Sequence, residues 1–300
     1  MYDLIIIGAG PAGITASVYA ARKRLNFLVV TKDIGGQTAW SGDIENYTGY
    51  QFITGPDLTA KFEEHMRQYK VELKENEEVL SVERIDTIIR VKTSKKEYDA
   101  STVIIASGKR SRELGVPGEK EFKNRGLTYC ATCDGPLFAE KDVAIIGGGN
   151  SGLDASLQLV RIARRIHLIN VSPELTGDPI MQEKVKENKI VTILNNCKVT
   201  AITGDKFVTG IRVKIKDKEE LIAVQGVFVE IGLMPNSGFT KGIEKNEFGE
   251  IKVDPYNHTS ISGIFAAGDV TNVPEKQIVI AAGEGSKAAL GVFRYLNQNR

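Results

Sequence analysis

Two cysteines separated by two residues are the part of this sequence best suited to redox chemistry. Cys130 and Cys133 form the pair, and Asp134 follows directly. Such a pair can close a small reducible disulfide or supply half of a zinc site. Zinc would need two further ligands, and the other candidates lack metal-like spacing: Cys197, His65, His167 and His258. A redox dithiol is therefore the preferred interpretation, and no metal is expected.

Asp134 and Cys197 have simpler alternative interpretations. Asp134 could exchange the proton that thiol–disulfide exchange requires, or it could be a solvated loop aspartate. Cys197 follows two asparagines at the end of a predicted strand, which is typical of a structural free thiol.

Two glycine-rich turns are the second feature of the sequence that indicates a function. They read Gly8-Ala9-Gly10-Pro11-Ala12-Gly13 and Gly147-Gly148-Gly149-Asn150-Ser151-Gly152. In such a turn the first glycine permits the tight bend, the second lets the backbone approach a pyrophosphate, and the third lets helix and strand pack closely. The helix N-terminus then offers N–H groups to the anion. The two turns predict two dinucleotide sites.

Each turn stands between a predicted strand and a predicted helix. The first copy joins a strand at 3–7, a helix at 14–24 and a strand at 27–31, and the second joins 143–146, 153–163 and 166–170. In both copies the return strand ends 23 residues after the first glycine, at Thr31 and at Asn170. This spacing indicates two copies of a βαβ unit. Mixed α/β sequence fills the rest, with a helix at 57–69, strands at 102–108, 190–194, 207–215, 227–231 and 263–269, and a closing helix at 283–296.

Length, charge and composition limit the possible classes. Three hundred residues exceed the usual size of one core, so two domains are expected, and Pro117-Gly118 is a plausible link between them. With 39 Lys+Arg against 38 Asp+Glu, nothing in the net charge of +1 suggests a nucleic-acid or membrane partner. Three cysteines are too few for a secreted disulfide scaffold. No signal peptide or spanning segment is apparent, so a cytoplasmic protein is expected.

Taken together, the motifs resemble the low-molecular-weight thioredoxin reductases, a family of FAD-dependent pyridine nucleotide-disulfide oxidoreductases, over the whole chain. The residues that carry the resemblance are the two turns, Gly36-Gln37, Glu45-Asn46-Tyr47, the segment from Cys130 to Gly135, and Gly268-Asp269. The glutathione-reductase branch has a wider-spaced cysteine pair near its N-terminus, where this chain has none.

The second half is especially similar to the flavoprotein subunit of alkyl hydroperoxide reductase. This similarity covers Gly147 to Ala155 and Lys276 to Gly283. That subunit carries an additional N-terminal thioredoxin-like part. Since this chain begins at the flavin domain, its disulfide partner is expected to be a separate protein.

The resemblance implies two Rossmann-like three-layer dinucleotide-binding domains, the second inserted into the first. It places FAD on 1–113 and 244–300, and a nicotinamide nucleotide and the dithiol on 114–243. The implied FAD residues are Gly8, Gly10, Pro11, Ala12, Gly13, Thr31, Gly36, Gln37, Asn46, Gly268, Asp269, Lys276, Gln277 and Ile278. The implied nicotinamide-nucleotide residues are Gly147, Gly149, Asn150, Ser151 and Gly152.

Individual roles also follow from the resemblance. Asn46, Gln37 and Gln277 would lie near the flavin ring, and Asp269 would bind the ribityl chain. Cys133 would face the flavin, Cys130 would be the outward interchange thiol, and Asp134 the acid/base. Such enzymes are homodimers that rotate one domain against the other and reduce a thioredoxin- or glutaredoxin-like protein.

One departure from the family pattern concerns the electron donor. Members that use NADPH carry His-Arg-Arg and a further Arg after the second return strand, whereas 170–178 contains no basic residue. Arg164 and Arg165 precede the strand and do not match that motif. Asn170 is also not the acidic residue that marks NAD binding. NADH is expected over NADPH, with ferredoxin or a reduced deazaflavin as alternative donors. A flavin-dependent dithiol oxidase and a non-catalytic nucleotide-binding protein are the other classes left open.

Overall fold

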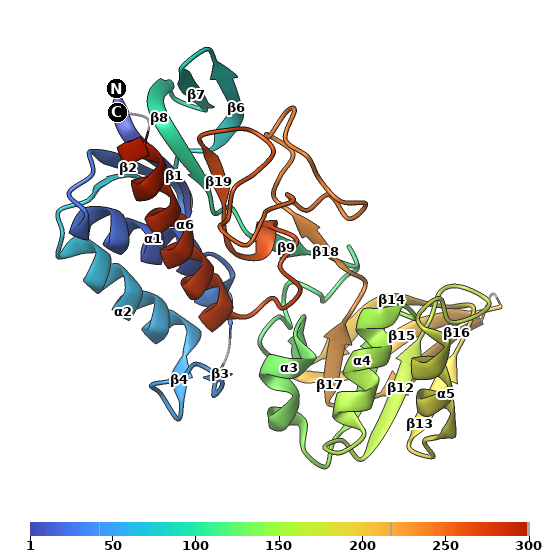
Figure 1. Ribbon diagram of the computed structural model, residues 1–300. Coiled ribbons are helices and arrows are strands. Elements are labelled where there is room, and N and C mark those ends of the chain that lie inside the picture. The colour runs from blue at the N-terminus through green and yellow to red at the C-terminus, as the bar shows by residue number, and fades with distance from the viewer. Residues whose placement is uncertain (42, 217, 299–300) are drawn as a thin grey trace. The chain divides into compact units, whose positions relative to one another are not determined.

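The computed structural model describes residues 1–41, 43–216 and 218–298, which divide into two units (Figure 1). Unit 1 comprises Met1–Ser41, Glu45–Arg110 and residues 234–298, and unit 2 comprises residues 43–44 and Ser111–Leu233. The chain passes between the units through β9 (Lys109–Ser111) and β18 (Leu233–Pro235), which pair with each other. Unit 2 is therefore an insertion into unit 1.

The crossing points differ from the boundaries expected after 113 and 243. The return crossing lies ten residues earlier because the segment after 233 bonds to unit 1, where the Asn236 N–H donates to the Gly108 carbonyl (2.9 Å) and the Val82 N–H to the Phe239 carbonyl (3.3 Å). Pro117-Gly118 is not the link. It lies inside unit 2, where the Pro117 carbonyl accepts a hydrogen bond from the Ile202 N–H (2.9 Å).

Unit 1 is built on a seven-stranded sheet in the order β5-β2-β1-β8-β7-β6, with β19 paired to β8. The pairs among β5, β2, β1, β8 and β19 are parallel, and β8-β7-β6 is an antiparallel meander. Its elements are β1 (Tyr2–Ala9), α1 (Pro11–Arg22), β2 (Phe27–Ile34), η1 (Gly36–Trp40), β4 (Ile53–Thr54), α2 (Gly55–Arg67), β5 (Glu72–Lys74), β6 (Val79–Ile85), β7 (Ile88–Thr93), β8 (Glu97–Ile105), β19 (Ile264–Ala266), η3 (Gly268–Val270) and α6 (Ile278–Gln298).

Alternating apolar side chains of β1 fill both faces of this sheet. Leu4 and Ile6 pack with α1 and α6 on one face, whereas Ile5 and Ile7 pack on the other face with residues from 243 to 270. Figure 1 shows α1 and α6 side by side over the first face. Burial on both faces explains why the β1 sequence is an unbroken apolar run.

The contact between α1 and α6 depends on a glycine. A Cβ at Gly285 would lie 2.0 Å from the Ala12 carbonyl oxygen, so alanine there would force the helices apart. We expect Gly285→Ala to lower the free energy of unfolding of unit 1 by about 1–3 kcal/mol, the usual cost of overpacking. Thermal and urea unfolding would measure it.

Gly283 on the same helix is the matched control. It is exposed, and within the described residues no atom lies within 4 Å of its Cβ position. Gly283→Ala should therefore raise stability by about 0.5–1 kcal/mol through helix propensity alone. Equal melting temperatures for the two variants would contradict this account of the packing.

Unit 2 is built on a five-stranded parallel sheet in the order β10-β17-β11-β12-β13 and a three-stranded antiparallel sheet β14-β15-β16. Its elements are β3 (Asp43–Ile44), β10 (Leu127–Thr128), α3 (Ala131–Asp134), η2 (Gly135–Phe138), β11 (Asp142–Ile146), α4 (Asn150–Leu159), β12 (Arg165–Ile169), α5 (Pro179–Glu187), β13 (Val191–Leu194), β14 (Cys197–Gly204), β15 (Val208–Ile215), β16 (Lys218–Ala223) and β17 (Gly226–Val229).

The parallel sheet of unit 2 also lies between two layers. Val143 and Ile145 of β11 pack with α4, α5 and the α3 segment, and Ala144 and Ile146 pack with the three-stranded sheet. The predicted α/β architecture of two three-layer, Rossmann-like domains, one inserted into the other, is confirmed. Among the described residues no helix is both long and apolar enough to cross a membrane.

For three helices the predicted first residue lies after the first residue of the helix in the structure. They were expected at 14, 153 and 283, whereas α1, α4 and α6 begin at Pro11, Asn150 and Ile278. In the first two, the middle glycine of the turn is itself the N-cap, so the helix begins at the next residue.

Candidate functional site

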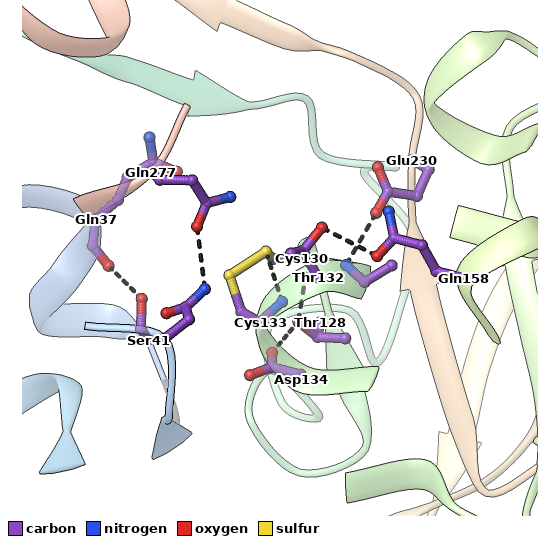
Figure 2. The surroundings of a disulfide bond; sticks show 12 residues. Gln37, Ser41, Thr128, Cys130, Thr132, Cys133, Asp134, Gln158, Glu230 and Gln277 are labelled. Carbon is purple, nitrogen blue, oxygen red and sulfur yellow. Dashed lines mark hydrogen bonds between the residues drawn. A yellow bond between two sulfur atoms is a disulfide. The ribbon is translucent and has the colours of Figure 1, made fainter. Parts of the chain in front are cut away.

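The two cysteines of the CxxC segment form a disulfide in unit 2. Cys130 and Cys133 lie 5.3 Å apart at their Cα atoms and are both half-buried (Figure 2). Cys130 is the N-cap of α3, and its Sγ accepts a hydrogen bond from the Cys133 N–H (3.1 Å). The same N–H would stabilise a Cys130 thiolate once the disulfide is reduced, because a donor near sulfur favours the charged form.

Asp134 lies beside this disulfide and is buried. Its carboxylate accepts a hydrogen bond from the Thr128 hydroxyl, and that hydroxyl oxygen accepts one from the Cys130 N–H (3.2 Å) (Figure 2). Thr128 thus connects the carboxylate to the backbone of the first cysteine. This arrangement holds a buried carboxylate next to the disulfide.

The two glycine-rich turns have the same geometry in the two units. Gly8 (φ +102°) and Gly147 (φ +136°) adopt backbone angles that favour glycine. A Cβ at Gly13 would lie 1.9 Å from the Gly8 carbonyl oxygen, and a Cβ at Gly152 would lie 1.9 Å from that of Gly147. The backbone conformation and close backbone contacts of each turn therefore require glycine at these four positions, whether or not a ligand is bound.

The middle glycine of each turn faces open space instead. Among the described residues, a Cβ at Gly10 would meet only the Gly35 carbonyl oxygen at 3.9 Å, and a Cβ at Gly149 only the Thr176 hydroxyl at 3.8 Å. The protein fold does not require glycine at either position. Both cap a helix whose N-terminus can bind an anion, so a close-lying phosphate is a physical reason for the missing side chain.

Unit 1 brings several predicted flavin-site residues together at the carboxyl ends of its parallel strands. The Asn46 amide donates to the Gln277 side-chain oxygen (3.1 Å), and Gln37 donates to the Lys109 carbonyl (2.5 Å). Gln277 precedes Ile278, the first residue of α6, and Gly36 (φ +54°) begins η1 with Gln37. Figure 2 shows Gln37 and Gln277.

Asp269 follows β19 at the same edge of that sheet. Within the described part of the chain its carboxylate accepts no hydrogen bond, and burial raises its pKa although Lys276 and Lys109 oppose the shift. Gly268 (φ +74°) before it packs against Ala12 of the first turn, with 3.0 Å from its Cβ position to the alanine methyl. A half-buried carboxylate without donors suits a ligand that carries hydroxyl groups.

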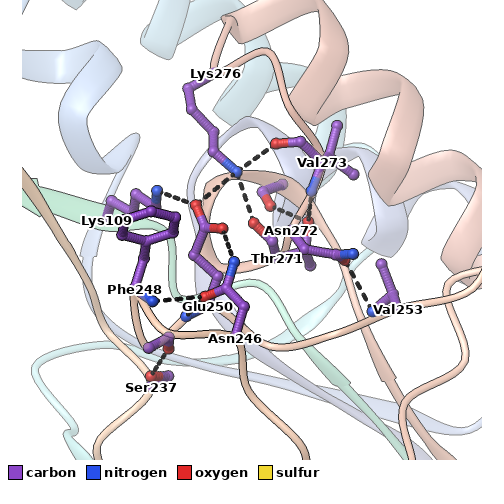
Figure 3. A network of polar contacts seen from close by, with 12 residues as sticks. Lys109, Ser237, Asn246, Phe248, Glu250, Val253, Thr271, Asn272, Val273 and Lys276 are labelled. Carbon is purple, nitrogen blue, oxygen red and sulfur yellow. Dashed lines mark hydrogen bonds and ion pairs between the residues drawn. The ribbon is translucent and has the colours of Figure 1, made fainter. Parts of the chain in front are cut away.

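The Lys276 ammonium takes part in an internal network (Figure 3). It donates to the carbonyls of Thr271 (2.6 Å) and Val273, and it pairs with Glu250 (3.3 Å). Burial opposes ionisation of Glu250, but Lys109, Asn246 and Lys276 together lower its pKa. The network fixes the segment between η3 and α6. The Lys276 side chain thus stabilises the conformation of this segment.

Thr31, which lies within β2 and not at its end as predicted, and Asn170, which directly follows β12, also form internal hydrogen bonds. The Thr31 hydroxyl accepts from the Ala9 N–H (3.2 Å) and donates to the Asp33 carbonyl (2.5 Å). Asn170 is 4% exposed, and its amide donates to the carbonyls of Ser172 (3.1 Å) and Glu174 (2.9 Å) and to the Asn195 side chain (2.9 Å). Asn170 therefore organises the following loop.

The remaining candidates are structural. Arg164 forms a two-pronged ion pair with Asp142 (both 2.9 Å) at the amino end of β12, away from the turn. Cys197 is a buried free thiol at the start of β14. In the described ranges no group of three or more His, Cys, Asp or Glu side chains could hold a metal ion.

Comparison with known proteins decides the family. The sequence pattern of the pyridine nucleotide-disulphide oxidoreductases matches residues 2–285. The chain belongs to this family. Members of this family use FAD and a nicotinamide nucleotide. As enzymes they are flavoprotein disulfide oxidoreductases.

Relatives and a solved structure agree with this family. The chain is 42% identical over 99% of its length to a protein named NADH dehydrogenase from Ferdinandcohnia aciditolerans, and 42% identical over 98% to a subunit of alkyl hydroperoxide reductase from Pseudomonas putida. It spans 58% of the length of each. The thioredoxin reductase structure from Streptococcus pyogenes has a TM-score of 0.94 and 37% identity, with 99% of both chains covered.

The residues of this pyridine nucleotide-disulphide oxidoreductase fit the family's cofactors. The open space at Gly10 and the half-buried carboxylate of Asp269 suit FAD in unit 1, and the open space at Gly149 suits a second dinucleotide in unit 2. One functional candidate was missed from the sequence. Glu230 follows β17 and hydrogen-bonds to both the dithiol segment and the second turn. Its only signal was a lone acidic residue within the predicted apolar strand 227–231.

Proposed function

We propose that this chain is an FAD-dependent disulfide reductase that transfers electrons from NADH, through the Cys130–Cys133 pair, to a disulfide of a thioredoxin- or glutaredoxin-like protein. The observation that carries the proposal is the presence, in one unit, of a disulfide and a glycine-rich turn at the carboxyl edge of the same parallel sheet. β10 leads to Cys130 and β11 leads to Gly147, with β17 between them. Ligands of parallel sheets gather at such carboxyl edges.

FAD is assigned to unit 1 and the nicotinamide nucleotide to unit 2. In unit 1 the turn from Gly8 to Gly13 would receive the pyrophosphate of FAD, and Asp269 would accept hydrogen bonds from its hydroxyl groups. Asn46, Gln37 and Gln277 would provide polar contacts to its ring. In unit 2 the turn from Gly147 to Gly152 would receive the pyrophosphate of the nicotinamide nucleotide.

The chemistry balances in two steps. In the first, NADH and one proton convert the disulfide to two thiols and leave NAD⁺. In the second, those two thiols reduce a partner disulfide and return to the Cys130–Cys133 disulfide. Bound FAD would supply the two-electron relay of the first step.

The two cysteines would have different roles in the thiol chemistry. Cys133 would receive the electron pair, and Cys130, stabilised as a thiolate by the Cys133 N–H, would attack the partner disulfide. Cys133 would then break the mixed disulfide. Asp134, held by Thr128, would supply or remove the proton. A homodimer with alternating access to the flavin completes the proposal.

NADH is the proposed donor because the loop after β12 offers no cation to a 2′-phosphate. Residues 170–178 contain no Lys or Arg, and Arg164 is paired with Asp142. A phosphate dianion there would lack charge-assisted partners. A relative at 42% identity also carries the name NADH dehydrogenase.

Anaerobic titration of the FAD-loaded protein tests the donor directly. Bleaching of the flavin absorbance by NADH, with a much weaker response to NADPH, is the expected result. Bleaching only by reduced ferredoxin or a reduced deazaflavin would replace the nicotinamide donor in this proposal. Rapid oxygen consumption with a small dithiol and no nicotinamide would indicate a dithiol oxidase instead.

Gly149→Ala should impair the donor step alone. In the part of the chain that the structure describes, the added methyl group would meet only Thr176, at 3.8 Å, so the unfolding temperature should not change. It would intrude on a pyrophosphate at the turn, at a cost of about 1–3 kcal/mol, which weakens nucleotide binding about fivefold to 150-fold. Stopped-flow flavin reduction over a range of NADH concentrations measures this. Unchanged NADH dependence would contradict the assignment of the nucleotide to unit 2.

A further inference from the structure

The two dinucleotide turns differ in the residue that follows the neighbouring strand. In unit 1 the Ala106 N–H donates to the Ile7 carbonyl (2.8 Å), and in unit 2 the Glu230 N–H donates to the Ile146 carbonyl (2.8 Å). The Cβ position of the first turn glycine faces a carbonyl oxygen of this residue in both units, at 2.4 Å for Ala106 and 2.2 Å for Glu230. Glu230 is thus the counterpart of Ala106, and an alanine suffices for the turn to form.

The Glu230 carboxylate connects the disulfide segment and the second turn of unit 2. Figure 2 shows its position beside the disulfide segment. One oxygen accepts a hydrogen bond from the Ser151 hydroxyl in the first turn of α4, and the other accepts one from the Ala131 N–H (3.3 Å) next to Cys130. In unit 1 the position of Ser151 is occupied by Ala12, so neither half of the contact has a counterpart there. Because unit 1 forms the same turn with alanine at both positions, folding of the turn does not explain why unit 2 has Glu230 and Ser151.

An ionised Glu230 carboxylate would compete with the ligand phosphates for the positive end of α4. The N-terminus of α4 attracts negative charge, and a dinucleotide pyrophosphate would bring a second anion to it. Among the described residues, the charged group that acts on Glu230 is Asp154 of α4, which adds negative charge. The α3 side contributes the uncharged disulfide and the Asp134 carboxylate, which accepts a hydrogen bond from Thr128 and is not among the groups that shift the pKa of Glu230. The turn contributes glycines and the uncharged side chains of Asn150 and Ser151. Burial, with a smaller effect of Asp154, raises the pKa of Glu230 to about 7, although Ser151 and Ala131 oppose the shift.

We propose that Glu230 is a proton-linked positioning residue, and that the turn from Gly147 to Gly152 binds its nucleotide with the Glu230 carboxyl protonated. The neutral carboxyl can still hydrogen-bond to Ser151 and Ala131 but no longer repels the pyrophosphate. This inference rests on the proposed nucleotide site and adds a proton to its binding reaction.

The sign of the pH dependence follows from linkage. A group that must be protonated in the complex favours binding below its pKa in the free protein and opposes binding above it. With that pKa near 7, the Kd for NAD⁺ should rise about 30-fold between about pH 6 and about pH 8.5, since each pH unit above the pKa costs about tenfold. At about pH 8, binding should take up about one proton.

Calorimetric titration of the oxidised, FAD-loaded protein with NAD⁺ tests this, because NAD⁺ binds without reducing the flavin. Two buffers with different ionisation enthalpies count the protons. Glu230→Gln should hold its Kd within about threefold over the same pH range, bind more tightly than the wild type at high pH, and take up no proton. Glu230→Ala, which reproduces the residue found in unit 1, should behave likewise. Glu183→Gln is the matched control, since it removes the same charge from an exposed position on α5.

The outcomes separate this inference from the proposed function. Binding of NAD⁺ with the same, pH-independent affinity in the wild type and Glu230→Gln would leave the nucleotide site standing and overturn the proton link. No binding at either pH in either protein would overturn the nucleotide site and the proton link together. Equal loss of pH dependence in Glu183→Gln would also overturn the role of Glu230. Thermal unfolding of all variants checks that the fold is retained.

Discussion

Cys130→Ser and Cys133→Ser are each expected to lower the rate of partner-disulfide reduction by at least about a thousandfold while FAD stays bound. Both sulfurs are needed, since one attacks the partner and the other breaks the mixed disulfide, and paired groups of this kind cannot substitute for each other. NADH should still bleach the flavin in both variants, because the donor step precedes the thiols. Steady-state reduction of a thioredoxin disulfide and anaerobic flavin spectra give the two readouts.

Cys197→Ala is the matched control for these variants. Cys197 is fully buried, and burial raises the pKa of its thiol to about 11, so it stays protonated and unreactive near neutral pH. The variant should keep full activity with a modest loss of stability. Substantial disulfide reduction by either Cys130→Ser or Cys133→Ser would show that electrons leave the protein by another route.

Gly10→Ala is expected to weaken FAD binding about tenfold to a hundredfold without destabilising the FAD-free protein. Within residues 1–41, 43–216 and 218–298, its Cβ would approach only the Gly35 carbonyl oxygen, at 3.9 Å, which is an ordinary van der Waals distance. The substitution therefore changes the space offered to a ligand and leaves the fold intact. Fluorescence titration of the stripped protein with FAD, beside its thermal unfolding curve, measures both quantities.

Gly10→Ala and Gly149→Ala are controls for each other. The same methyl group is added to the N-cap glycine of each turn, so a general effect on folding would appear in both. The assignment predicts that Gly10→Ala loses FAD affinity and that Gly149→Ala keeps FAD but responds poorly to NADH. FAD loss caused by Gly149→Ala, with none in Gly10→Ala, would reverse the cofactor assignment of the two units.

The repeated βαβ units could be predicted from the sequence because their signals are local. Apolar runs, the glycine spacing and the common 23-residue register all lie within about thirty residues of each other. Helix starts were placed late because the capping role of Gly10 and Gly149 depends on backbone angles, which apolar periodicity does not report. The β6–β7 hairpin and β14 were missed, since their exposed polar residues interrupt the apolar pattern.

The site was harder to predict where function depends on contacts distant in sequence. The disulfide is local and was expected, but the contact from Glu230 to Ala131 joins residues 99 positions apart. The strand order β10-β17-β11 places these segments side by side, and no spacing rule in a single sequence gives that order. Asn170 lies directly after β12, within one residue of the predicted strand end, whereas β2 continues three residues beyond Thr31 to Ile34. The internal hydrogen bonds of both residues depend on loops that only the fold defines.

The central claim is that electrons from NADH reach the Cys130–Cys133 disulfide. The direct test is anaerobic addition of NADH to the oxidised, FAD-loaded protein, followed by alkylation under native conditions and mass spectrometry of the cysteine peptides. The account predicts alkylation of Cys130 and Cys133 after NADH and of neither before it, with buried Cys197 unmodified throughout. Bleaching of the flavin with the disulfide still intact would contradict it.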